Sequence, residues 1–169
     1  MTPLNSKNIE GTNTVKLVQI ESKTIVGHKV RTKNDREMEP ATAKIGGLWA
    51  KFTTDIAPNL GTDNVGYGVY TEYETDHTGA FDVLAGSTPY EGSENAGLSQ
   101  VVLVEDDYLV FSGVGELPQA VINVWSEQIW PYFNKNSCIH ERAYTTDFEL
   151  YKGAEAVDIY IAIKKQATA

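Results

Sequence analysis

The sequence predicts an α+β fold in which two copies of one short unit share an antiparallel sheet or face each other. Three observations support this prediction. Several segments alternate apolar and polar residues as β-strands do, and two others carry apolar residues at helical spacing. The order of these segments repeats about 81 positions later, so that Trp49 corresponds to Trp130 and Tyr70 to Tyr151. We expect a single domain over residues 15–165, with repeats at about 15–90 and 98–165.

The first repeat is expected to hold one helix between strands. Glu39-Pro40 suits the first turn of a helix, which we predict over about 41–54. Two consecutive glycines, Gly46 and Gly47, weaken this helix by about 1 kcal/mol each relative to alanine. Its apolar stripe consists of Ile45, Leu48, Trp49 and Phe52. The segments expected as strands are 16–21, 24–30, 65–73 and 81–86.

The second repeat has the same order. Its helix opens at Leu117-Pro118, and Pro131 is expected to kink or end it. The stripe of this helix consists of Val121, Val124, Trp125, Ile129 and Phe133, and the expected strands are 100–104, 108–113, 142–151 and 157–163. Each half is therefore β-β-α-β-β, or β-α-β-β if one long bent strand replaces the first pair. A concave site would lie on the side opposite the helices or at the seam between the copies, and the strand pattern does not distinguish the two.

The overall composition excludes several classes of protein. The chain has 169 residues and 41% hydrophobic residues, which suffices for one packed core. No apolar run is long enough to span a bilayer and no signal peptide opens the chain, and residues 1–14 are expected to form a flexible leader. A single cysteine, Cys138, excludes an internal disulfide and is typical of a cytoplasmic protein. The net charge of −9 argues against direct binding of nucleic acid.

Motifs for a cofactor, a metal or a catalytic nucleophile were not found. The glycines at 66, 68, 113 and 115 lack the strand-to-helix context of a phosphate-binding loop. His28, His77 and His140 lie far apart and lack the spacing of a zinc site. Cys138 lies two residues from His140, but this spacing alone does not favour a catalytic role. We therefore expect no cofactor, no metal and no catalytic residue.

The segment 144–151 is the most informative stretch, because it places two carboxylates in an aromatic strand. The two-residue period puts Phe148 and Leu150 on one face and Asp147, Glu149 and Tyr151 on the other. One interpretation is a half-exposed strand with Glu149 in water. The other is that Glu149 lies at the bottom of an aromatic pocket that accepts a positively charged guest, since burying a lone carboxylate is costly.

The chain resembles the GyrI-like effector-binding domain family, a small-molecule module that is also fused to AraC- and MerR-type regulators. The resemblance covers roughly residues 15–165. It is carried by the stretches 108–115 leading into Leu117-Pro118, 147–151 and 157–163, with 67–70 and 81–86 from the first half. Stand-alone members include a gyrase-protecting protein and integron-cassette drug-binding modules, and the chain looks most like the latter. Only about 14 residues precede the first strand, so we expect no helix-turn-helix.

The resemblance implies a pseudo-twofold pair of β-α-β-β units with a central ligand cleft. It also implies binding of lipophilic, often cationic compounds by a glutamate within an aromatic ring. The glutamate would be Glu149, and the lining would be Trp49, Tyr67, Trp125 and Tyr160, with Tyr70, Phe111 and Tyr151 as further candidates. From the residues alone, Trp49 and Trp125 are as compatible with core packing as with ligand contact. Tyr67 and Tyr160 lie on strand faces opposite the isoleucine-type residues, which favours the cleft.

Three functions compete. The first is non-catalytic binding of hydrophobic, cationic small molecules. The second is a small-molecule hydrolase that uses the same glutamate as an acid or base. The third is a protein-interaction module that shields a partner such as gyrase. Exposed edge strands are compatible with a homodimer, and a separate regulator protein is a further candidate partner.

Overall fold

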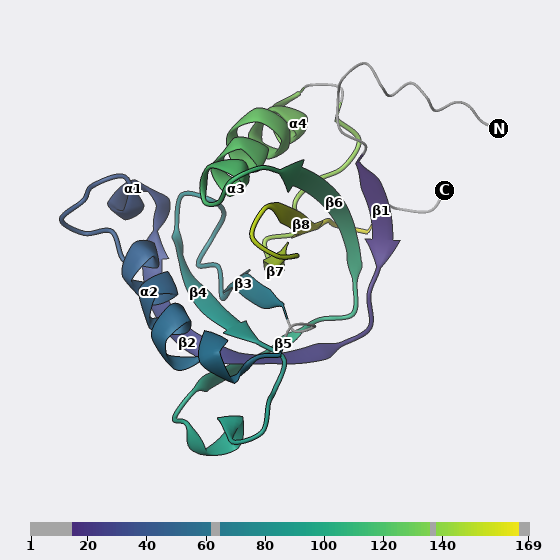
Figure 1. The fold of residues 1–169 in the computed structure, drawn as a ribbon. Coiled ribbons are helices and arrows are strands. Elements are labelled where there is room, and N and C mark those ends of the chain that lie inside the picture. Colours follow the sequence, from purple (N-terminus) through teal and green to yellow (C-terminus); the bar gives the residue numbers. More distant parts are fainter. Residues whose placement is uncertain (1–14, 62–64, 136–137, 166–169) are drawn as a thin grey trace.

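A computed structural model describes residues 15–61, 65–135 and 138–165. The leader expected at 1–14 lies outside the described residues. Eight antiparallel strands form one sheet in the order β1-β6-β8-β7-β3-β4-β2-β5. The strands are β1 (Lys16–Gln19), β2 (Lys23–Lys33), β3 (Gly66–Thr71), β4 (Ala80–Ser87), β5 (Ser99–Leu103), β6 (Asp107–Val114), β7 (Thr146–Tyr151) and β8 (Ala156–Ala162). Together with two main helical segments they give the expected α+β fold (Figure 1).

The sheet is symmetric about its centre, where β3 pairs with β7. Gly68 lies opposite Glu149 in this pair, and these two residues are 81 positions apart, as are the copies in the sequence. A pseudo-twofold axis therefore passes between them. Each unit supplies three strands and a helix, β2-α-β3-β4 and β6-α-β7-β8. The short strands that precede the units are exchanged, since β1 pairs with β6 and β5 pairs with β2.

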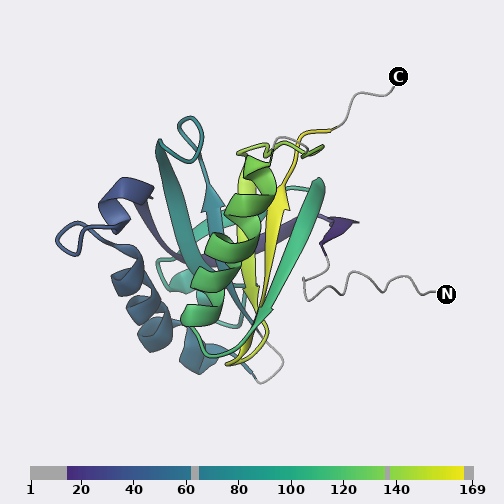
Figure 2. The same ribbon diagram turned by 90° about the horizontal axis from the view of Figure 1, so that it is seen from above.

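The α-helices and the π-helix lie on one side of the curved sheet (Figures 1 and 2). The short helix α1 (Asn34–Glu37) and the helix α2 (Ile45–Asp55) adjoin β2, and α2 also packs on β4. A three-residue 3₁₀ turn, Ala57–Asn59, follows α2, and another, Ser93–Asn95, precedes β5. The second main segment consists of α3 (Gln119–Asn123), a π-helix (Val124–Ile129) and α4 (Trp130–Asn134), and it packs on β6 and β8.

Both main helices differ from their predicted bounds for identifiable reasons. The first begins at Ile45 rather than near 41, because the Glu37 carboxylate accepts the backbone N–H groups of Lys44 and Ile45 and so caps the helix there. The second does not end at Pro131, but continues to Asn134. A proline cannot donate the usual helical hydrogen bond, and the wider π turn directly before it shifts the hydrogen-bond register.

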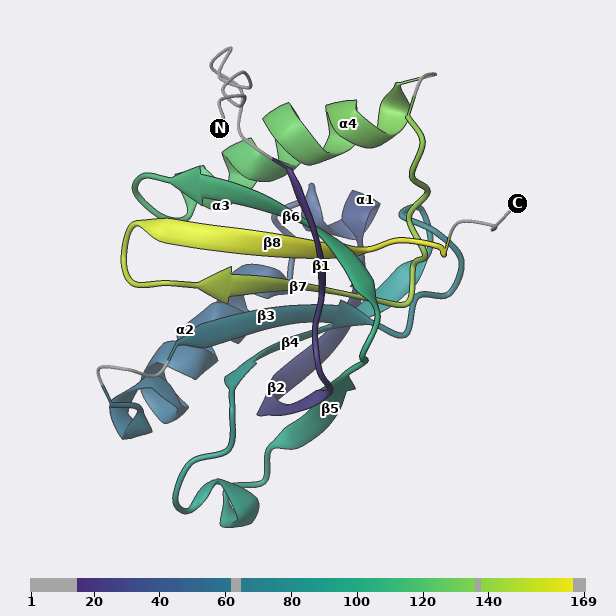
Figure 3. The ribbon, with the colours of Figure 1, turned by 90° about the vertical axis from the view of Figure 1, so that its right-hand side faces the viewer.

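The apolar core forms on both faces of the sheet. On the side with the helices, one cluster lies beneath α2 and another beneath α3–α4, the latter including Ile159 and Ile161. A third cluster lies on the concave face away from the helices and includes Tyr67, Tyr108 and Phe148. Figure 3 looks toward this concave face, with β1 in front of the other strands. Within the described part of the chain, every helix is too short or too polar to cross a membrane.

Candidate functional site

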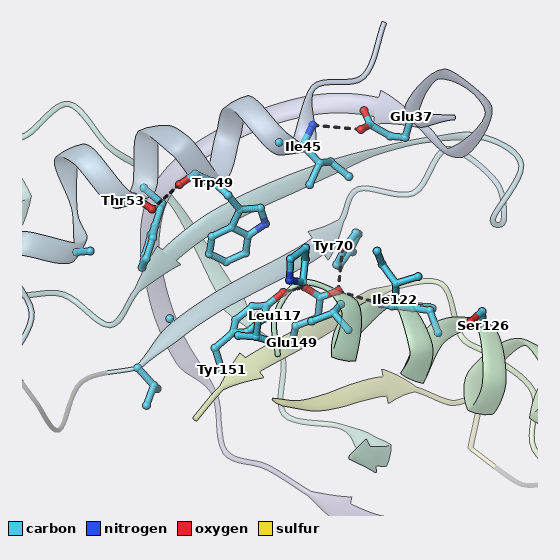
Figure 4. Close-up of a pocket in the computed structure, with 18 of the residues that line it drawn as sticks. Glu37, Ile45, Trp49, Thr53, Tyr70, Leu117, Ile122, Ser126, Glu149 and Tyr151 are labelled. Atoms are coloured by element: carbon cyan, nitrogen blue, oxygen red, sulfur yellow. Dashed lines mark hydrogen bonds between the residues drawn. The ribbon is translucent and has the colours of Figure 1, made fainter. Parts of the chain in front are cut away.

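A large pocket of about 1410 Å³ opens at the seam between the two units, on the side of the sheet that carries the helices. One wall is α2 and the other is α3 with the π-helix, while β3 and β7 form the floor (Figure 4). The wall residues are mainly apolar and include Ile45, Trp49, Phe52, Leu117, Val121, Ile122 and Trp125. Of the two places that the sequence allowed for a concave site, this large pocket occupies the seam.

Glu149 lies at the centre of this floor, and its side chain is almost completely buried, with 1% exposure. Three neutral groups donate hydrogen bonds to its carboxylate. The hydroxyl of Tyr151 lies 2.5 Å from Oε1, while the hydroxyl of Tyr70 and the indole Nε1 of Trp125 lie 3.0 and 2.9 Å from Oε2. The interpretation that placed Glu149 in water on a half-exposed strand is therefore wrong.

The carboxylate has hydrogen-bond partners but no countercharge. No ion pair joins Glu149 to a lysine, arginine or histidine in the segments that the structure describes. Burial raises the pKa of Glu149, and the hydrogen bonds from Tyr151, Trp125 and Tyr70 offset only part of that effect. Burial and the adjacent charge of Glu149 in turn raise the pKa of Tyr70 and of Tyr151, so both hydroxyls remain protonated donors.

Gly68 provides the space that the carboxylate occupies. A Cβ atom at this position would lie 2.8 Å from Oε1 of Glu149 and 3.0 Å from Cζ2 of Trp49. Because Gly68 and Glu149 are related by the pseudo-twofold axis, one unit contributes the charge and the other the space for it. Tyr70 and Tyr151 are also related by this axis, and they bind the carboxylate from its two sides. The duplication thus builds a site with one central acid.

The aromatic rings around the carboxylate contact one another mainly by their edges. Trp49 lies 5.1 Å from Tyr151 and 5.2 Å from Phe52 between ring centroids, and Tyr70 lies 5.9 Å from Trp125. These edge-to-face arrangements leave ring faces available to a guest. Trp49 and Trp125 are only partly buried, so both line the pocket as well as packing against the core.

The second carboxylate of β7 has a different environment. Asp147 is fully buried and receives hydrogen bonds from Arg142 at 2.8 Å, from the hydroxyl of Tyr73 at 2.6 Å and from the backbone N–H of Ala162 at 2.9 Å. The Arg142 guanidinium also lies over the ring of Trp125, 5.7 Å from its centroid. The buried arginine next to the site therefore neutralises Asp147 and leaves Glu149 unpaired.

Five of the eight residues predicted from the sequence come together in this pocket: Glu149, Trp49, Tyr70, Trp125 and Tyr151. The other three do not line it. Phe111 has no exposed surface and packs beneath α4 against Tyr132 and Phe133. Tyr67 and Tyr160 lie on the concave face, away from the helices. Their strand faces were identified correctly, but the pocket lies on the same side of the sheet as the isoleucines and the helices.

Several lining residues were not singled out as ligand contacts from the sequence. Phe52 and Ile45 belong to the predicted stripe of α2, and Val121 to that of the second helix, where the same spacing that indicates a core face also supplies the pocket wall. Ile122 was left out of the predicted stripe, although it lies three residues before Trp125 and seven before Ile129, and it is half exposed at the pocket. This helical spacing was the signal that could have identified it.

Comparison with known proteins assigns this arrangement to a family. The family model of the integron-associated effector binding proteins matches residues 16–163. The chain belongs to this family. An integron cassette protein from the mobile metagenome of Vibrio cholerae is similar over 89% of this chain and 95% of its own, with 45% identity and a TM-score of 0.82. The likeness to effector-binding modules expected from the sequence is thereby confirmed, and this effector-binding protein has small-molecule binding as its general function.

A second similar structure shares the fold at lower identity. SAV2435, solved bound to tetraphenylphosphonium, is 24% identical, with a TM-score of 0.69, over 89% of this chain and 94% of its own. No curated protein matches the chain.

Proposed function

We propose that the effector-binding protein reversibly binds lipophilic organic cations in the pocket between α2 and α3, with Glu149 as the countercharge. The observation that carries this proposal is the buried carboxylate that has three neutral donors and no ion-pair partner in the described residues. An ion pair with a guest would supply the missing charge, and the guest would shed its water against apolar walls. SAV2435 holds a lipophilic cation, tetraphenylphosphonium, on a similar fold, which supports the proposal.

The expected affinity follows from the contacts that the pocket offers. An aromatic face attracts a cation by about 0.5–2 kcal/mol, and burial of apolar surface adds roughly 25 cal/mol per Å². After the cost of association, several aromatic walls and one ion pair correspond to micromolar binding, near −8 kcal/mol. Few directional contacts are needed, so cations of different shape should fit.

Catalysis by the same glutamate is less well supported. Donors already bind both carboxylate oxygens, Oε1 through Tyr151 and Oε2 through Tyr70 and Trp125. A general base needs an accessible lone pair directed at the proton that it removes. The acidic surface is compatible with a protein partner but does not select one. Reversible binding is therefore the function that best fits the geometry.

Tryptophan fluorescence is a suitable assay, because all three tryptophans of the chain line the pocket. We expect methyltriphenylphosphonium to quench this fluorescence and to bind at least about tenfold more tightly than the neutral triphenylphosphine oxide. A tenfold difference in affinity corresponds to one charge-assisted contact. Glu149→Gln should remove this preference. Glu127→Gln is the matched control, since it deletes an exposed carboxylate from the π-helix. Equal affinities of the two ligands for the parent protein would refute the proposal.

A further inference from the structure

A second, smaller hollow of about 320 Å³ lies on the concave face of the sheet, away from the helices. Its base is formed by Tyr67, Phe148, Leu150 and Tyr160 from the three central strands β3, β7 and β8. Its rim is formed by Leu103, by residues 20–22 of the connection from β1 to β2, and by Lys23 at the start of β2. The hollow therefore contains both tyrosines that were expected in a ligand site but do not line the Glu149 pocket.

The walls of this hollow are aromatic and ordered by stacking. The rings of Phe148 and Tyr160 stack at 4.4 Å with an interplanar angle of 10°, and Tyr67 lies 6.1 Å from Phe148. Tyr67 and Phe148 are buried, whereas Tyr160 and Leu150 retain exposed surface. A flat guest can therefore bury a ring face here and stay within reach of solvent. The volume lies at the lower end of the range for small-molecule sites.

The polar groups at the rim define the charge of the guest. The ammonium of Lys23 lies 3.3 Å from the hydroxyl of Tyr67, to which it donates, and 5.8 Å from the centroid of that ring. Lys23 forms no ion pair among the described residues, so its charge is available. Burial, followed by the charge of Asp158, raises the pKa of Tyr160, which keeps its hydroxyl a donor.

Two acidic residues lie near the hollow, and neither forms an ion pair with Lys23. Glu21 also lines the hollow, but it is exposed, and no ion pair joins it to Lys23. Asp158 is already paired with Lys152 at 3.0 Å and accepts a hydrogen bond from Ser112. The polar residues that line the hollow are therefore Glu21, Ser22, Lys23, Tyr67 and Tyr160, and Lys23 is the one cation among them.

We propose that this hollow is a second binding site, for small aromatic monocarboxylates whose ring packs on Tyr160 and Leu150 and whose carboxylate pairs with Lys23. The site is distinct from the Glu149 pocket, since Phe148 and Glu149 are neighbours on β7 whose side chains point to opposite faces. The two faces of one strand would then select guests of opposite charge.

Methyl NMR separates the two sites because each is lined by its own isoleucine and leucine residues. Ile20, Leu103 and Leu150 report on the hollow, and Ile45 and Ile122 report on the Glu149 pocket. The probe is indole-3-acetate, with the neutral indole-3-acetamide as its isosteric control. We expect saturable shifts at the first group only, and about tenfold weaker binding of the amide, as for loss of one contact to a charged group.

Lys23→Gln should weaken indole-3-acetate binding about tenfold, to the level of the amide, while Lys51→Gln, an exposed lysine on α2, should leave it unchanged. Glu149→Gln should also leave it unchanged, which makes this test independent of the proposed cation site. Shifts confined to Ile45 and Ile122 would overturn the proposal. Equal binding of indole-3-acetate by the parent protein and by Lys23→Gln would also overturn it. The absence of shifts up to about 10 mM indole-3-acetate would do the same, because a site with a Kd near 1 mM would be almost saturated at that concentration.

Discussion

Gly68→Ala tests whether the site depends on the space that one unit leaves for the carboxylate of the other. The added Cβ would lie 2.8 Å from Oε1 of Glu149 and 3.0 Å from the ring of Trp49, so both groups must move. Oε1 is the atom that accepts the hydrogen bond from Tyr151. Overpacking of this kind costs about 1–3 kcal/mol, and loss of a hydrogen bond to a charged group adds about 1.5–3 kcal/mol if the carboxylate turns away.

Urea unfolding and calorimetric titration with methyltriphenylphosphonium measure the two consequences. We expect Gly68→Ala to lower the free energy of unfolding by at least about 1 kcal/mol and to weaken cation binding by about tenfold or more. Gly47→Ala is the control, because a Cβ there meets nothing within 4 Å and the helix should gain up to about 1 kcal/mol. A Gly68→Ala protein with the stability and affinity of the parent would show that Gly68 is not needed to seat Glu149.

Four further predictions concern the site and the core next to it. The pKa of Glu149 is higher in the folded than in the unfolded protein, so the folded state binds more protons between these two pKa values. Unfolding curves should therefore show the free energy of unfolding falling as pH rises through this window, and falling less in Glu149→Gln. Calorimetry should show the affinity for the cation rising over the same window. Trp125→Phe deletes one donor to the carboxylate, so the pH midpoint of cation binding should move upward; an unmoved midpoint would contradict this. Phe111→Ala should destabilise the fold by about 3–5 kcal/mol in urea unfolding yet leave cation affinity unchanged, since Phe111 lies in the core; weaker binding by the folded variant would place it in the site. Arg142→Met leaves Asp147 buried without its partner and should cost about 3–5 kcal/mol in the same assay, and a cost below about 1 kcal/mol would argue that the pair is dispensable.

The symmetric sheet could be predicted from the sequence because the repeat is encoded in residue spacing. The 81-position offset that relates Tyr70 to Tyr151 also sets the pairing of Gly68 with Glu149 at the centre of the sheet. The duplicated order of strands and helix followed from local periodicity alone. The exchange of β1 and β5 between units did not, because a short edge strand carries no pattern that specifies its partner.

The site was harder to predict because periodicity assigns residues to faces but does not say which face opens into a pocket. Tyr67 and Tyr160 do lie opposite Ile159 and Ile161, yet the helices leave a gap on the isoleucine side at the pseudo-twofold axis. The direction of Trp125 depends on a π-helical turn, which the sequence did not indicate.

The sequence also did not indicate which carboxylate forms the ion pair with Arg142. Asp147 and Glu149 lie on the same face of one strand, and no local pattern decides which of the two carboxylates the arginine neutralises. The choice depends on where residue 142 is held relative to β8, through its bridge to Ile163. This tertiary contact is what leaves Glu149 without a charge partner.

The role of Glu149 can be tested by following the pKa of its side-chain carboxyl group with carbon NMR. We predict a pKa above the ordinary value for glutamate in the free protein, because the carboxylate is buried without a countercharge. Saturation with methyltriphenylphosphonium should lower this pKa, with release of a proton on binding in the pH range between the two values. An ordinary pKa that methyltriphenylphosphonium leaves unchanged would contradict the role assigned to Glu149.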